Sequence, residues 1–154
     1  MTHTLRVKPL PLDMTVEGFM EAVALLGDWD YDYLHMPINN KNGKLQGFAY
    51  INFPVVEDAA AFCLAVWGHH FGVSCPAKID ISAYQGLEQN LEALCSSNWD
   101  RRMKVMELAA SMGIAGHGEV HVRIDGYMQP ITNKEQVEEI MRRVLKDDTG
   151  SLRA

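Results

Sequence analysis

Hydrophobic and polar residues alternate in four short segments of the first 85 residues, and this period of two predicts four β-strands. The segments are 4–8, 31–37, 46–53 and 78–82. Between them, apolar residues recur at helical spacing from Val16 to Leu26 and from Glu57 to Trp67, which predicts two amphipathic helices. In the second helix the residues in helical register are Ala60, Ala61, Leu64 and Trp67. In the last strand Ile79 and Ile81 point inward.

The resulting order is strand-helix-strand-strand-helix-strand within about 80 residues, which is the order of the ferredoxin-like split βαβ arrangement. In that arrangement the helices pack on one face of the sheet and leave the other face free. The fold class predicted for residues 1–85 is therefore α+β, of the ferredoxin-like β-α-β-β-α-β type.

Residues 86–146 predict a C-terminal extension of the α-β-β-α kind. A helix from near Gly86 to about Ser96 carries Leu87, Leu91 and Leu94, and a further helix spans 99–112. Segments 120–124 and 127–131 flank Asp125-Gly126, a strong two-residue hairpin turn signal. Thr132 to Glu135 fits a capping box, and the helix that follows carries a stripe of Val137, Ile140, Met141, Val144 and Leu145. Residues 147–154 form a polar tail.

The strand at 46–53 carries two sets of side chains with different roles. Ala49, Ile51 and Phe53 share one face, which must be the core side because all three are apolar. Phe48, Tyr50 and Asn52 share the opposite face, where a sheet open to solvent is normally polar. Two aromatic rings on an open face indicate a surface on which flat ligands can stack.

The segment Gln46-Gly47-Phe48-Ala49-Tyr50-Ile51-Asn52-Phe53 resembles the octamer of the RNA-recognition motif, K/R-G-F/Y-G/A-F-V-x-F/Y. Gln46 is the exception, because a basic residue usually stands at that position. With Leu5-Arg6, 31–38 and 81–87 added, residues 4–98 are similar to the motif as it occurs in the Mei-two-like class of meiosis regulators. The resemblance implies a sandwich fold whose outward aromatics stack on RNA bases.

From this resemblance the expected contacts to single-stranded RNA fall into three groups. Phe48 and Tyr50 stack bases, while Arg6 and Lys8 contact phosphate or a third base. The flanking contacts are Tyr33, Gln46, Asn52 and Lys78. Arg6 stands where most such motifs have an aromatic ring, and Lys8, Lys44 and Lys78 are the nearby cations that can replace the missing octamer cation. His35 is interpreted as a simple sheet-surface residue.

The charge balance works against nucleic-acid binding and keeps a second hypothesis open. The 154 residues carry 14 Lys and Arg against 20 Asp and Glu, a formal net charge of −6. Basic patches are the usual electrostatic footprint of nucleic-acid binding. The apolar C-terminal helices could also cover the sheet face and bury Phe48 and Tyr50. In that alternative the fold serves as a protein-interaction or structural subunit, with a protein partner bound through residues 86–146.

Other functional classes find little support in the sequence. No nucleophile–base signature or phosphate-binding glycine loop is present, so an enzyme is not expected, and no cofactor is implied. His117 and His121 have a four-residue spacing but no helix supports them, which disfavours a metal site. The cysteines are too few and too far apart for a disulfide framework, and no run of 18 apolar residues exists. We expect an intracellular protein, nuclear or cytoplasmic, with an organelle not excluded.

Overall fold

The computed structural model describes residues 1–38, 45–96, 99–112 and 120–146. The predicted tail 147–154 and the side chains of Lys44 and His117 lie outside these ranges. In chain order the elements are β1 (Thr4–Lys8), α1 (Val16–Ala24), β2 (Tyr33–His35), β3 (Ala49–Asn52), α2 (Val56–Val66), β4 (Lys78–Ile81), α3 (Gly86–Ser96), α4 (Trp99–Ser111), β5 (Val120–Ile124), β6 (Tyr127–Ile131) and α5 (Lys134–Lys146).

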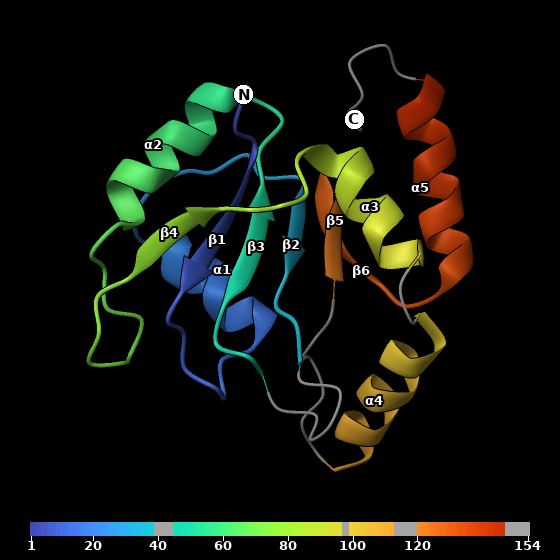
Figure 1. The fold of residues 1–154 in the computed structure, drawn as a ribbon, viewed down its shortest axis with the longest axis horizontal. Coiled ribbons are helices and arrows are strands. Elements are labelled where there is room, and N and C mark those ends of the chain that lie inside the picture. Colours follow the sequence, from blue (N-terminus) through green and yellow to red (C-terminus); the bar gives the residue numbers. More distant parts are fainter. Residues whose placement is uncertain (39–44, 97–98, 113–119, 147–154) are drawn as a thin grey trace.

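The described strands form a single antiparallel sheet in the order β4-β1-β3-β2-β5-β6 (Figure 1). Its first four strands, with α1 and α2, reproduce the ferredoxin-like arrangement, so the predicted fold class is confirmed. The hairpin β5–β6 pairs with β2 and lengthens the same sheet. The C-terminal extension therefore contributes strands to the sheet as well as helices.

The main core lies between the sheet and helices α1 and α2. The predicted inward side chains of the 46–53 segment, Ala49, Ile51 and Phe53, have no exposed surface. They pack in one cluster with Phe19 of α1 and Phe62 of α2. β3 itself is shorter than predicted, covering Ala49–Asn52. The alternation predicted from the sequence is confirmed in this core.

Helix α2 buries a different face from the one in the predicted register. Ala59, Phe62 and Val66 are buried, whereas Leu64 and Trp67 are 86% and 58% exposed. The physical reason is that α2 is apolar on both sides, so its largest ring decides the orientation. Phe62 packs against Phe53, with the ring centroids 5.1 Å apart.

The second correction concerns Ile81, which was predicted to point inward but is 69% exposed. Its neighbour in the alternation, Ile79, does pack against the main core. Ile81 is the last residue of β4, which is the edge strand of the sheet, so it has a neighbouring strand on one side only. An apolar side chain therefore remains on the surface beside α2.

The chain passes from β4 to the other face of the sheet at Gln85 and Gly86. The Gln85 side-chain oxygen accepts backbone N–H groups of His3 and Thr4 at 2.8 and 2.9 Å, and its Nε2 donates to the Thr4 carbonyl at 2.8 Å. Gly86 then opens α3 with φ of +85°, a conformation that costs glycine little. As a result α3 lies on the opposite side of the sheet from α1 (Figure 1).

Helix α3 builds a second core on that face. Its predicted leucine stripe, Leu87, Leu91 and Leu94, is buried together with Tyr33 and Val122 of the sheet. Helix α5 contributes the buried side chains Val137, Ile140 and Val144 to the same cluster. The predicted leucine stripe is therefore confirmed, and its docking surface is the face opposite α1 and α2.

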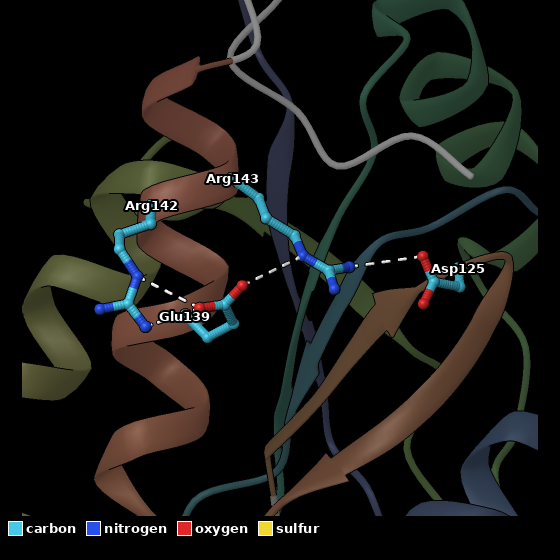
Figure 2. Close-up of polar contacts among 4 residues, drawn as sticks. All are labelled: Asp125, Glu139, Arg142 and Arg143. Atoms are coloured by element: carbon cyan, nitrogen blue, oxygen red, sulfur yellow. Dashed lines mark hydrogen bonds and ion pairs between the residues drawn. The ribbon is translucent and has the colours of Figure 1, made fainter.

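The hairpin and α5 are joined at the predicted turn. Asp125 and Gly126 both have positive φ, +52° and +87°, as a type I′ turn requires. Arg143 of α5 reaches the Asp125 carboxylate at 3.3 Å and Glu139 at 3.6 Å (Figure 2). Arg142 pairs with the same Glu139 at 2.6 Å. These groups are solvent-exposed, so each pair contributes only about 0–1 kcal/mol to stability.

The capping box of α5 lies one residue later than predicted. The Asn133 side-chain oxygen accepts the Gln136 backbone N–H at 2.9 Å, and the Gln136 side-chain oxygen accepts the Asn133 backbone N–H at 3.1 Å. Both Thr132-x-x-Glu135 and Asn133-x-x-Gln136 fit the sequence pattern, and the amide oxygen of Gln136 also accepts the Thr132 backbone N–H.

Within the described ranges, no helix is both long and apolar enough to span a membrane.

Candidate nucleic-acid interface

The face of the sheet opposite α1 and α2 carries the predicted RNA-contacting residues in rows set by the strand register. One row runs across four strands through Asp80, Arg6, Tyr50 and His35. The next row runs through Thr4, Asn52 and Tyr33 to Val122. Helix α3 covers the second row, so only part of this face stays open.

Phe48, Tyr50 and Arg6 form a compact group on the open part. The rings of Phe48 and Tyr50 are 5.6 Å apart and nearly perpendicular, and both are partly exposed. The Arg6 guanidinium carbon lies 5.4 Å from the centre of the Phe48 ring, within cation–π range. The structure therefore brings together three of the eight side chains that the sequence predicted to contact RNA.

The cations of this group are held by a carboxylate that the sequence analysis did not anticipate. Asp80 accepts from Arg6 at 2.8 Å and lies 3.2 Å from the ammonium group of Lys8. Hydrogen bonds from Arg6 and Lys8 lower the pKa of Asp80, and the Asp80 carboxylate raises the pKa of Arg6. All three side chains remain between a third and a half exposed. One carboxylate thus offsets one of the two positive charges of the predicted phosphate contacts.

Gln46 and Lys78 lie at the margins of the open face. Gln46 is exposed, and its side-chain Nε2 donates to the Ile38 carbonyl at 3.2 Å. Lys78 is exposed on the edge strand β4, directly opposite Lys8 on β1. Both side chains are accessible to a ligand that crosses the sheet, in the flanking positions predicted for them.

Tyr33 and Asn52 are not accessible in this arrangement. Tyr33 is 3% exposed and packs in the second core beneath α3. Asn52 is 1% exposed, accepts from the Thr4 hydroxyl at 2.5 Å and donates to Asp32 at 2.7 Å. Asn90 of α3 donates to the same Thr4 hydroxyl at 3.1 Å. Asn52 is thus used to attach α3 to the sheet, and we leave it out of the interface. Tyr33 is covered by α3 but lines the pocket beside Tyr50.

Beside Tyr50, a pocket of about 230 Å³ opens between the sheet, α3 and α4. Most of its lining residues were not predicted as contacts, and two of these, His35 and Arg102, bear on its chemistry. His35 lines it from β2, and its burial lowers its pKa to about 3, so the ring is neutral. Arg102 lines it from α4, and burial lowers the pKa of its guanidinium. The sequence pattern does not distinguish Arg102 from Arg101, because only the packing of α4 directs one of them to the sheet.

The histidine and cysteine residues do not form a metal site in the part of the chain that the structure covers. Among the described residues, no group of three or more His, Cys, Asp or Glu side chains is suitably close. His121 lies on β5 as predicted, and its buried ring is 3.9 Å from the Glu17 carboxylate of α1.

No protein-family model and no curated protein matches the chain. Among solved structures, it is similar to the Rna15 RNA-recognition motif with bound RNA (GU), with 22% identity over 60% of this chain and 97% of that chain and a TM-score of 0.47. A second structure of the RNA15 motif is 23% identical over 53% of this chain and 90% of that chain, with a TM-score of 0.46. The second RNA-recognition motif of yeast poly(U)-binding protein Pub1 is 21% identical over 53% of this chain and 95% of that chain, with a TM-score of 0.46. At these identities the likeness concerns the fold alone.

Proposed function

We propose that this chain is a single-stranded RNA-binding module that uses the open part of its sheet face. The observation that carries the proposal is the group of Phe48, Tyr50 and Arg6, in which two accessible rings and a guanidinium lie together on one surface. Each base stacked on an aromatic ring contributes about 1–3 kcal/mol to single-strand binding. Lys8, Lys78 and Gln46 flank the group and can contact the RNA backbone.

The resemblance to the Mei-two-like class rests on sequence motifs and supports the same proposal. In this view residues 1–85 form the RNA-binding unit, and residues 86–146 are an extension that restricts access to the sheet. RNA as the ligand implies a site of action inside the cell, in the nucleus, the cytoplasm or an RNA-containing organelle. With Tyr33 and Asn52 covered, the open face is expected to hold a short stretch of nucleotides.

The test is a fluorescence titration of a labelled mixed-sequence RNA decamer at 50 mM salt, with wild type, Phe48→Ala and Tyr50→Ala. Each substitution is expected to weaken binding by between about 5-fold and about 100-fold, because one stacking contact is lost. Trp67→Ala is the matched control, since this ring is exposed at the end of α2, on the other side of the sheet. Absence of binding by wild type, or equal affinities for all four proteins, contradicts the proposal.

A second candidate is a protein-interaction subunit, and one observation favours it. An apolar groove of about 520 Å³ lies between α2 and the edge strand β4, lined in part by Val56, Ala60, Leu64 and Ile81. Exposed apolar surface of this kind often marks a protein contact. The two candidates use opposite sides of the sheet. Leu64→Glu is expected to abolish self-association or partner binding in the second case, with RNA affinity unchanged, as measured by analytical ultracentrifugation beside the titration.

A further inference from the structure

The pocket beside Tyr50 has the shape and wall chemistry of a site for one flat ring. Its floor is formed by side chains of the sheet, including Tyr50 and His35, and its walls by Leu94 of α3 and Arg102 of α4. Phe48 lies at its open side, perpendicular to Tyr50. The volume of about 230 Å³ is smaller than that of sites for drug-sized ligands, which measure about 300–1,000 Å³. It suits a single planar ring system.

Arg102 gives this pocket an unusual electrostatic character. Its Nη1 is buried and has no hydrogen-bond partner among the described residues. Arginine cannot lose its proton in a protein, so burial leaves both a positive charge and unused N–H donors in the wall. Among the described residues that line the pocket, none is a carboxylate that could neutralise this charge. Unpaired buried donors are costly to folding, so the site is set up for a ligand that supplies acceptors.

The other walls restrict what that ligand can be. His35 stays neutral, and its ring is inclined by only 32° to the ring of Tyr50. The floor is therefore an uncharged aromatic surface, on which a base can stack and a lone phosphate gains nothing. A ligand that combines a π-face with hydrogen-bond acceptors on its edge satisfies both the floor and Arg102. Guanine, with O6 and N7, and uracil, with O4, have this combination on the edge where adenine and cytosine carry an amino group.

We propose that the pocket receives one nucleobase of the bound RNA and selects bases with a keto edge, guanine above uracil, through Arg102. Guanine presents O6 and N7, two adjacent acceptors that match the paired donors of a guanidinium. Uracil presents a single O4 acceptor. Adenine and cytosine carry an amino group on the corresponding edge, and a donor that faces the Arg102 donors leaves both groups without an acceptor. This inference rests on the proposed function and names its base preference.

The inference also assigns a role to the C-terminal extension. Arg102 belongs to α4, outside the β-α-β-β-α-β unit, and Leu94 belongs to α3. The extension covers part of the sheet face and places Arg102, a candidate base-contacting residue, beside the open part. Arg102 would act as a binding residue that contacts the base directly.

The experiment uses four RNA hexamers in which five positions are abasic and one central position carries guanine, uracil, adenine or cytosine. Each hexamer has one base, so the base that enters the pocket is known. Wild type is expected to bind the guanine hexamer at least about 10-fold more tightly than the adenine hexamer, in line with one bidentate arginine contact. Arg102→Met is expected to bind all four hexamers equally. Arg101→Met, an exposed neighbour on the same helix, is expected to keep the preference.

Unfolding measurements distinguish a binding role of Arg102 from a structural one. Arg102→Met removes a partly buried charge and a buried Nη1 without a hydrogen-bond partner, so its free energy of unfolding is expected to equal or exceed that of wild type. Loss of stability in parallel with loss of base preference overturns the inference. So does a wild type that binds the four hexamers equally, or a preference that survives in Arg102→Met. If wild type binds the mixed decamer but binds the four hexamers equally, only this inference fails. If it binds no RNA, the proposed function fails with it.

Discussion

At the level of single residues, two buried titratable groups close together in the sequence, Asp32 and His35, have opposite effects on how stability depends on pH. Asp32 precedes β2 and is 1% exposed, and burial raises its pKa to about 6 despite a hydrogen bond from Asn52. His35 lies three positions later, and burial, aided by the charge of Arg102, lowers its pKa to about 3. In the unfolded chain the two groups titrate near their ordinary values, about 3.9 and 6.5.

The free energy of unfolding should therefore depend on pH through two terms of opposite sign. Between about pH 4 and 6 the folded state holds a proton on Asp32 that the unfolded state releases, so this term stabilises the fold at low pH and disappears as pH rises through 6. Between about pH 3 and 6.5 the unfolded state takes up a proton on the imidazole of His35. The second term therefore destabilises the fold progressively as pH falls below 6.5.

We expect His35→Gln to lose less stability than wild type on going from pH 6.5 to 4, and Asp32→Asn to lose more. Urea unfolding at pH 6.5, 5 and 4 measures both differences. The comparison with wild type cancels the contributions of the other carboxylates. Parallel pH profiles for the three proteins would show that neither group is buried in the way described.

At the level of elements, the sequence predicted which helices and strands exist, but it did not predict which of their faces pack together. In α2, Phe62 and Leu64 lie on different faces, and after Glu57 and Asp58 in the first turn every residue is apolar, so polarity does not mark which face is buried. In α3 the leucine stripe was clear, but its docking surface depends on the side-chain amide of Gln85, which holds the chain against β1. Such a contact joins positions about 80 residues apart and leaves no local periodic signal.

The docking of α3 can be tested by a matched pair of leucine substitutions. Leu91 has no exposed surface beneath α3, whereas Leu64 on α2 is 86% exposed. Leu91→Ala is expected to lower the free energy of unfolding by about 2–5 kcal/mol, because it removes buried apolar volume and leaves a cavity. Leu64→Ala should stay within about 0.5 kcal/mol of wild type. Denaturant unfolding measures both, and similar losses for the two variants would mean that α3 does not pack on the sheet.

At the level of the whole molecule, the net charge of −6 disfavours RNA binding, whereas the aromatic sheet face favours it. The sequence identified Arg6 and Lys8 as the cations nearest the octamer. Their pairing with Asp80 follows from the register, because Asp80 on β4 stands directly opposite Arg6 on β1. Alternation already put Asp80 on the face opposite Ile79, so the pairing could have been derived once β4 was known to lie beside β1. The burial of Tyr33 and Asn52 could not have been derived in this way, because it depends on where α3 packs on the sheet.

This ion-pair arrangement predicts how RNA binding responds to salt. Each phosphate that a protein cation neutralises contributes about −0.7 to the slope of log affinity against log salt for a single strand. In wild type, Arg6 and Lys8 share their charge with Asp80, so we expect a shallow slope. Asp80→Asn removes the one negative charge that offsets these two cations and should steepen the slope by about 0.7. It should also tighten binding several-fold at 50 mM salt, with the two curves converging as salt increases.

The matched control for this prediction is Glu57→Gln on α2, which makes the same change in net charge on the other side of the sheet. If the general negative field of the molecule limits RNA binding, both variants gain affinity equally and their salt slopes stay parallel. If Asp80 instead holds Arg6 over the Phe48 ring in the orientation that bases require, Asp80→Asn binds more weakly than wild type at every salt concentration. Only a steeper slope of log affinity against log salt that is specific to Asp80→Asn identifies Arg6 and Lys8 as phosphate contacts that are weakened in wild type by their ion pairs with Asp80. Titrations at 50, 100 and 200 mM salt separate the three outcomes.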